Sequence, residues 1–368
     1  MEGKPAPARI RALDWHRGLA VIVMIECHAL ALLSSTHDAE PFRQFLNSIN
    51  GLVAPSFIYA AGFALSMVLC RAAIEPVGRR QRALKSVLRI GEVVVVAHIL
   101  KWCLWPVRED PWQWLRVDIL SCIAYSLLAL WACVLALGNR PRTIAAIMGV
   151  LAAIIFAASP WTETVTDAGA LQYFINPKSD SPFPVLPWAG YAFLGAALGA
   201  PVAIPDRGPS YLARGLFAML IAGFAIAWSG PLFERLYPWN PWILTNAGER
   251  IWKVAAISLL LLGAERFGNA RGWAMKNPVT WVLELYGTSS LSAFYFHTTL
   301  LFGAFVWLPF GWSIFFGPLY PLMGKCGWAG YGALAVGIIA LTGVLCRAWD
   351  PIDRRLPWKA KKKKPAAP

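Results

Sequence analysis

The stretch RALDWHRGLAVIVMIECHALAL, residues 11–32, decides the fold class of this chain. A helix needs about 20 mostly apolar residues to cross the roughly 30 Å hydrocarbon core of a bilayer, and this run has that length. It also carries ionisable side chains, among them Asp14, Arg17 and His28. Such a group at the centre of a membrane helix costs about 2.5–3.5 kcal/mol, so it is a candidate for function. The stretch therefore predicts a membrane helix that contributes to a buried site.

The helical period places the three side chains on one face of this segment. Arg17 and His28 are 11 positions apart, which is three turns plus about 20°, and Asp14 precedes Arg17 by about one turn. At about 1.5 Å per residue, Arg17 lies roughly 16 Å from His28, towards the cytoplasmic edge. A cation near the membrane surface and a base near the middle of the bilayer suit a long thioester donor, whose phosphates would meet the cation and whose acyl carbon would meet the base. The residues alone equally allow a positive anchor at Arg17 and a packing role for His28.

The composition extends this interpretation to the whole chain. Of 368 residues, 57% are hydrophobic and 15% charged, against about 25% charged in soluble domains, which excludes a soluble globule and a disordered chain. We predict an all-α membrane bundle, with one domain over residues 1–350 and a basic tail over 351–368. Ten apolar runs are predicted to span the membrane, at residues 18–33, 51–70, 87–105, 115–137, 143–158, 185–204, 212–228, 251–264, 281–306 and 330–346.

The net charge of +14 reflects topology more than nucleic-acid binding, which we do not expect. Ten crossings place 25 of the 34 Lys and Arg residues on one side, in short loops and the tail, and nine on or near the other. The positive-inside rule then predicts that both termini are cytoplasmic. The KAKKKK segment of the tail is expected to contact anionic lipid headgroups.

Several other residues are weaker candidates for a site. The loop at 176–188 is rich in Pro and aromatic residues and is expected on the far side of the membrane, where Trp188 can contact a sugar and other tryptophans form an interfacial belt. His16 is expected at the interface, and His98 to pair with Glu92 or another buried acid. The remaining candidates, each with structural pairing or packing as the alternative role, are His37, Arg116, Asp118 and His297.

The seven cysteines and the local motifs exclude other classes of site. No CxxC pair occurs and no histidine lies close to a cysteine in a metal-ligand spacing, so we expect free thiols and no metal site. No phosphate-binding loop is present, and the first span does not end in a signal-peptide cleavage pattern. The pair Gly195-x3-Gly199 predicts a close helix contact.

Five sequence stretches, spread from one end of the chain to the other, carry a resemblance. They are RIRALDWHRGLAVIVMIECH (9–28), GLVAPSFIYAAGFALS (51–66), WLRVDILSCIAYSLL (114–128), FPVLPWAGYAFLGAALG (183–199) and LYGTSSLSAFYFHTTLL (285–301). In this order they resemble the bacterial branch of the heparan-α-glucosaminide N-acetyltransferase catalytic family. The first stretch is also similar to the broader type-3 membrane acyltransferases, whose first helix carries an Arg and a His 11 residues apart.

The resemblance implies transmembrane acyl transfer in a bacterial inner membrane. An acyl group, usually acetyl, passes from cytoplasmic acyl-CoA to a sugar hydroxyl or amine on the far side, with no tightly bound cofactor. Arg17, held by Asp14, would contact the donor with Arg79 and Arg80. The catalytic base would be His28 or His37, because this chain has His28 where the heparan branch tends to have Asn, while His37 is nearer to that branch's catalytic histidine.

Two other classes of function stay open at this point. A proton-coupled transporter would suit the buried ionisable groups, although no internal repeat is visible. A non-catalytic member of the fold, acting as a homodimer or as a subunit of a larger membrane complex, would keep the same helix motifs after losing the chemistry.

Overall fold

The computed structural model describes residues 10–74, 78–104, 115–165, 169–176, 178, 181–204, 208–240, 242–272, 277–307, 313–353 and 355. The loop 105–114 and residues 356–368 of the basic tail lie outside the described residues, so the expectations for them stay predictions. Within the described part, seven helical stretches are long and apolar enough to cross a membrane. The chain is therefore an all-α membrane protein in its architecture, as the sequence predicts.

The long helices follow the predicted spans closely, with short helices between some of them. Their bounds are α1 Arg11–Ala29, α2 Pro41–Asn50, α3 Val53–Ile74, α4 Arg79–Leu104, α5 Ile119–Ala136, α6 Pro141–Thr162, α7 Gln172–Ile175, α8 Val185–Val202, α9 Gly208–Trp228, α10 Gly230–Leu236, α11 Trp242–Ala270, α12 Pro278–Thr288, α13 Ser290–Phe302 and α14 Trp328–Asp353. Two strands, β1 Ala304–Trp307 and β2 Ser313–Phe316, form an antiparallel hairpin that the sequence analysis did not predict.

Three of the ten predicted spans are not among the seven apolar stretches. Helix α4 has 26 residues but begins with a run of cations, and α11 has 29 residues but carries Glu249, Arg250 and Lys253 near its start. The predicted span 281–306 is divided, because α12 ends at Thr288 and α13 begins at Ser290. The Thr288 hydroxyl donates to the carbonyl of Glu284 at 2.7 Å, a bond that commonly bends or ends helices.

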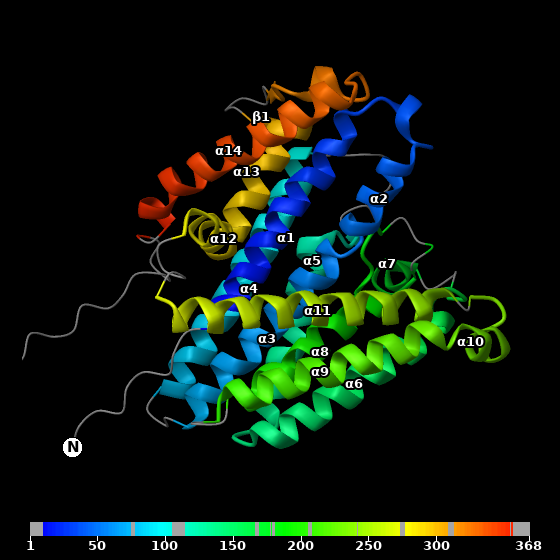
Figure 1. Cartoon of the computed structure of the whole chain (residues 1–368), viewed down its shortest axis with the longest axis vertical. Coiled ribbons are helices and arrows are strands. Elements are labelled where there is room, and N and C mark those ends of the chain that lie inside the picture. Colours follow the sequence, from blue (N-terminus) through cyan, green and yellow to red (C-terminus); the bar gives the residue numbers. More distant parts are fainter. Residues whose placement is uncertain are drawn as a thin grey trace, which may run out of the picture.

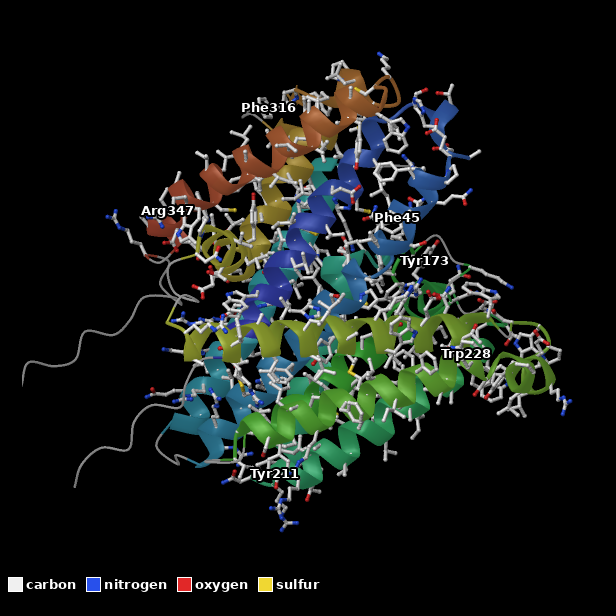
Figure 2. The ribbon with its side chains drawn as sticks, viewed as in Figure 1. Phe45, Tyr173, Tyr211, Trp228, Phe316 and Arg347 are labelled. Atoms are coloured by element: carbon white, nitrogen blue, oxygen red, sulfur yellow. The ribbon has the colours of Figure 1, made fainter. Side chains whose placement is uncertain are left out.

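The helices form two groups that meet at α1 and α3 (Figure 1). One group contains α6, α8, α9 and α11, and the other contains α12, α13 and α14. Large apolar side chains remain exposed on the outside of both groups. Figure 2 shows Phe45, Trp228 and Phe316 projecting from the ribbon, and Trp228 is 75% exposed. A lipid environment accounts for such side chains, which a soluble surface rarely gathers in number.

Small residues allow the closest helix contacts. On α8, Gly195 and Gly199 face the backbone of Tyr59 and Phe63 on α3, and a Cβ atom at either glycine would overlap that backbone. The predicted contact at Gly195-x3-Gly199 is therefore confirmed. Helices α1 and α12 cross in the same way, where Gly287 lies against the backbone of Asp14. This crossing fixes the helix that carries the candidate site.

The start of α1 is held by a side chain from α11. No side chain of α1 or of its N-cap residue Ile10 caps the helix. Instead, the buried carboxylate of Glu265 accepts hydrogen bonds from the backbone N–H groups of Arg11 at 2.9 Å and Ala12 at 3.0 Å. These groups would otherwise lack partners, because the first turn of a helix has none within the helix. The contact brings the end of α11 to the start of α1.

Candidate functional site

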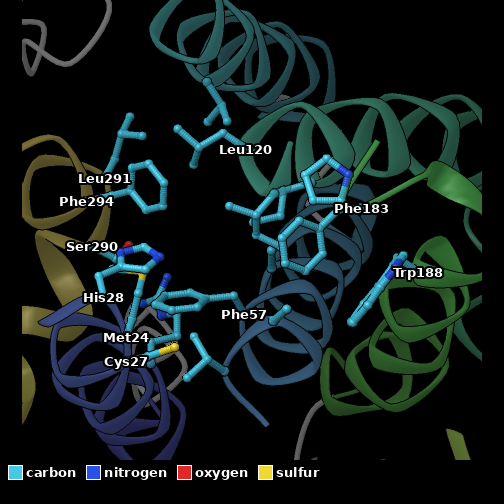
Figure 3. A pocket seen from close by; sticks show the side chains of 18 of the residues that line it. Met24, Cys27, His28, Phe57, Leu120, Phe183, Trp188, Ser290, Leu291 and Phe294 are labelled. Atoms are coloured by element: carbon cyan, nitrogen blue, oxygen red, sulfur yellow. The ribbon is translucent and has the colours of Figure 1, made fainter. Parts of the chain in front are cut away.

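A cavity of about 500 Å³ lies between α1, α3, α5, α8 and α13 (Figure 3). Most of its wall is apolar, with Phe57, Leu120, Phe183 and Phe294 among the lining side chains. An enclosed apolar space with a few polar groups is the usual form of a small-molecule site. The polar and ionisable side chains that line it are Arg17, Cys27, His28, Asn50, Trp188, Arg250 and Ser290.

His28 and His297 form a hydrogen-bonded pair on the wall of this cavity. The Nδ1 atom of His28 lies 2.7 Å from Nε2 of His297, and the two ring planes are within 15° of each other, with their centroids 5.0 Å apart. His297 is fully buried, while His28 is half-buried and lines the cavity. The rings of Phe294 and Phe302 meet His28 edge-on at 6.2 and 5.6 Å. The imidazole of His28 is thus held from several sides.

The backbone of α13 determines which nitrogen of each ring carries a proton. Nδ1 of His297 lies 2.6 Å from the carbonyl oxygen of Ala293, and a carbonyl can only accept, so this nitrogen donates. In a neutral His297, Nε2 is then bare and accepts from Nδ1–H of His28. A neutral His28 consequently has its lone pair on Nε2, the nitrogen that is not bonded to His297, and its side chain lines the cavity. This is the tautomer that a general base needs.

Arg17 lines the same cavity as His28, in agreement with the predicted stripe on α1. Its guanidinium forms an ion pair and hydrogen bond with the buried carboxylate of Asp14, as the spacing predicts. Because an acidic partner neutralises it, Arg17 adds a directed set of N–H donors and little net charge to the wall. The other acid of the helix, Glu26, accepts a hydrogen bond from Tyr331 on α14 and so does not orient His28.

His37 lies away from the cavity, in the short 3-10 helix Ser35–His37. Its Nδ1 bonds to Oε1 of Glu40 at 2.7 Å, and Nε1–H of Trp328 donates to the other carboxylate oxygen at 2.6 Å. These two hydrogen bonds lower the pKa of Glu40, which lies outside the membrane-spanning segments. His37 therefore ties the segment after α1 to the start of α14.

The other predicted site residues divide between the cavity and the helix ends. Trp188 lines the cavity, across from His28 (Figure 3). Asp118 instead caps the start of α5, where its carboxylate accepts from the N–H of Ser121 at 2.7 Å. The backbone carbonyl of Arg116 accepts from Nζ of Lys101 at 2.6 Å. These two residues thus contribute to the structure around the start of α5.

The two predicted arginines of the donor site, Arg79 and Arg80, begin α4 and do not line the cavity. Arg79 donates to the carbonyl of Leu135 at 3.2 Å, and Arg80 is exposed. Any effect they have on a donor acts at the surface of the protein.

Two further histidines lie outside the cavity, and the acidic partner predicted for one of them, His98, is wrong. His16 is buried between α1 and α11, where its Nδ1 lies 3.0 Å from the hydroxyl of Ser258, and its place at the membrane interface stays a prediction. His98 donates to the carbonyl of Val94 on its own helix at 2.8 Å and has no acidic partner among the described residues. A carbonyl one turn earlier is always within reach of a helical histidine, so a buried acid is not needed.

A second cavity, of about 930 Å³, lies between α4, α13 and α14. Ser290 and Leu291, at the first turn of α13, line both cavities, so the break between α12 and α13 lies where the two spaces meet. Hydroxyl groups of Thr288, Ser289 and Ser292 line the second cavity. Across the part of the chain with assigned positions, no group of three His, Cys, Asp or Glu residues is arranged to hold a metal ion.

A sequence model of the heparan-alpha-glucosaminide N-acetyltransferase catalytic family matches residues 9–222, which is more than half of the chain. The chain belongs to this family. Membership points to a membrane acetyltransferase-like domain and to acyltransferase activity in general. No curated protein matches the chain.

The family match covers only part of the candidate site. It contains Arg17, His28 and Trp188, whereas Arg250 on the cavity wall and His297 behind His28 follow it in the sequence. From the sequence, His297 is only a weak site candidate with packing as the alternative, and Arg250 is not a predicted site residue, because neither has a local motif. The fold is what brings them to the residues of the matched segment.

Proposed function

We propose that this protein is an integral-membrane acyltransferase of a bacterial cytoplasmic membrane. It moves an acyl group, in the simplest case acetyl, from cytoplasmic acyl-CoA to a sugar hydroxyl or amine on the opposite side. The observation that carries the proposal is the His28–His297 pair, whose hydrogen bonds leave a bare imidazole nitrogen on His28, a side chain that lines an apolar cavity. Family membership supports the reaction class.

The proposed topology has ten crossings with both termini in the cytoplasm, α12 and α13 together forming one crossing. The start of α1 and the ends of α11 and α14 lie on one side of the bundle (Figure 1), and basic residues predominate in the connections expected there. On this topology Arg17 lies nearer the cytoplasm than His28, because α1 starts there. Donor and acceptor then approach from opposite sides.

In the proposed reaction, Nε2 of His28 takes the proton from the acceptor hydroxyl or amine as the acceptor oxygen or nitrogen attacks the thioester carbonyl carbon. The new C–O or C–N bond forms and the C–S bond breaks. The CoA thiolate leaves and receives the proton from the His28 imidazolium. His297 supports this cycle because its bare Nε2 accepts from Nδ1–H of His28 in both the neutral and the protonated state.

The donor is proposed to reach His28 from the second cavity, through the wall formed by Ser290 and Leu291. The hydroxyls of Ser289 and Ser292 can donate to the amide carbonyls of a pantetheine arm, and the Thr288 hydroxyl, which donates to Glu284, can accept from an amide N–H of that arm. Arg17, oriented by Asp14, contributes N–H donors on the donor's side of the cavity. Arg79 and Arg80 raise the local concentration of the anionic donor at the surface.

The test uses the full chain in lipid nanodiscs with labelled acetyl-CoA and a set of amino sugars and glycosides. We expect label on an acceptor, and a loss of about 10²–10⁴-fold in transfer rate for His28→Gln. His37→Gln serves as the matched control and keeps the wild-type rate, because His37 lies outside the cavity. Undiminished transfer by His28→Gln, or no transfer by the wild-type protein to any acceptor, would contradict the proposal.

A further inference from the structure

Among the described residues, Arg250 is the cation of the proposed reaction cavity that has no acidic side chain paired with it. It lies on α11 and lines the cavity, and it forms no ion pair with a side chain in the described ranges. This distinguishes it from Arg17, which is paired with Asp14, and from Lys253 one turn later, which is paired with Glu249. The net positive charge of the cavity wall therefore comes from Arg250.

The guanidinium of Arg250 is held in a fixed orientation by an aromatic ring. Its central carbon lies over the ring of Trp188 at 5.3 Å from the centroid, and Phe183 meets Trp188 edge-on at 5.0 Å. In a stacked arrangement the ring attracts the face of the guanidinium and leaves the N–H groups along its edge free. Trp188 thus orients Arg250 without using its hydrogen-bond donors.

Arg250 is a half-buried cation at an apolar cavity, and the neutral hydroxyl of Tyr191 lies close enough to accept a hydrogen bond from it. A cation in such a place is costly unless an anion or another strong acceptor completes it. A planar guanidinium matches carboxylate and phosphate groups through paired N–H···O bonds. The apolar wall strengthens such a contact, because fewer waters compete for the charges. The chemistry of the site thus favours a ligand with one anionic group.

The position of Arg250 assigns it to the acceptor rather than to the donor. Glu265, near the end of α11, touches the start of α1, so these two helix ends lie together. Arg250 precedes Glu265 by 15 residues, which is about 22 Å along α11. Arg17 is only six residues, or about 9 Å, from the start of α1. The two helices also meet where Ser258 on α11 contacts His16, next to Arg17. Arg250 precedes Ser258 by eight residues, or about 12 Å, so the two arginines lie on different parts of the cavity wall.

We propose that Arg250, oriented by Trp188, binds a carboxylate or phosphate carried by the acceptor, so that the protein selects anionic sugars. The assignment of this anion to the acceptor rests on the proposed acyl transfer, but binding of an anion at Arg250 can be measured without turnover. Trp188 acts here as a positioning residue, since its ring face is covered by the guanidinium.

The experiment compares three probes that differ in charge: methyl glucoside, methyl glucuronide and glucose 6-phosphate. Binding of each probe to the full-length protein in nanodiscs is measured by calorimetry without acyl-CoA, and acetyl transfer to each probe is then measured separately. We expect at least about tenfold tighter binding of one or both acidic probes than of the neutral probe. If methyl glucuronide binds more tightly, the preferred anionic group is a carboxylate; if glucose 6-phosphate does, it is a phosphate.

Three variants show whether Arg250 is the cause. Arg250→Gln should remove the preference for acidic probes and leave binding of the neutral probe unchanged. Arg250→Lys should keep part of that preference, because lysine supplies a point charge without the paired N–H donors. Lys253→Gln, a control on the same helix, should keep the full preference because Lys253 is already paired. CoA binding should be the same in all of them, since Arg250 lies on a different part of the cavity wall from Arg17.

Equal binding of all three probes by the wild-type protein would overturn the inference. Weaker CoA binding by Arg250→Gln would also overturn it, because Arg250 would then belong to the donor site. An equal loss of binding for all three probes in Arg250→Gln would overturn it too, because the role of Arg250 would then be structural. A preference for acidic probes in binding without transfer to any probe would support the anion site and contradict the acyltransferase function.

Discussion

Replacement of His297 by Phe tests the arrangement on which the chemistry depends. The variant keeps a ring of similar size but removes the nitrogen that accepts from Nδ1–H of His28 at 2.7 Å. A buried donor left without a partner costs about 1–3 kcal/mol. His28 avoids that cost by changing its tautomer or turning its ring, and either change withdraws the bare Nε2 from the cavity. Since about 1.4 kcal/mol is a factor of ten, the reactive form should fall about five- to 150-fold.

Two further variants separate the hydrogen bond from packing. His297→Gln offers a carbonyl oxygen in place of the ring nitrogen and should recover part of the rate. His98→Phe removes a histidine that makes the same bond to a carbonyl one turn earlier, at 2.8 Å, but has no imidazole partner. It should leave the transfer rate unchanged.

The assay is single-turnover acetyl transfer in nanodiscs, combined with ¹⁵N spectra of histidine-labelled protein. The spectra should show His28 protonated at Nδ1 in the wild-type protein and lose that signal in His297→Phe. A wild-type rate in His297→Phe would refute the reasoning, as would a spectrum in which Nε2 of wild-type His28 carries the proton at neutral pH.

The remaining predictions concern stability and are measured by thermal unfolding of the purified protein. Gly199→Leu should lower the free energy of unfolding by about 1–3 kcal/mol, because a side chain there overlaps the backbone of α3. Gly263→Ala should raise the free energy of unfolding by about 0.5–1 kcal/mol, because Gly263 is exposed within a helix and has room for a methyl group. Glu265→Gln should cost about 1 kcal/mol, since one of two caps on α1 is lost; an unchanged melting temperature would contradict this. Glu40 has a lowered pKa in the folded protein, so its ionised carboxylate stabilises the fold. This stabilisation is complete above the pKa of the unfolded state, about 4.3, and is lost as the pH falls through the lower pKa of the folded state. The melting temperatures of wild type and Glu40→Gln should therefore differ at pH 7 and converge in acid, and a constant difference would show that the bonds from His37 and Trp328 do not depend on the charge.

Features that depend on one helix were predictable from the sequence. The helical period places Asp14, Arg17 and His28 on one face of α1, and the structure brings Arg17 and His28 to one cavity. The Gly195-x3-Gly199 contact was predictable for the same reason, because spacing along one helix determines which atoms face a neighbour.

Features that depend on distant contacts were not predictable. His28 and His297 are 269 residues apart, and nothing in either local sequence indicates that the other lies 2.7 Å away. The cap that Glu265 places on α1 is a contact of the same kind. The break at Thr288 escaped prediction because hydropathy is continuous across it, while the bend arises from a hydroxyl bond to the backbone.

The common wall of the two cavities has a consequence for insulation across the bilayer. Ser290 and Leu291 border both spaces, so in the proposed reaction these two residues separate the thioester from the sugar. A wall of this kind would let an acyl group cross while bulk water and ions stay on their own sides. Trimming Leu291 to Ala would open the partition, and the thioester would then be wasted on water before any acceptor arrived.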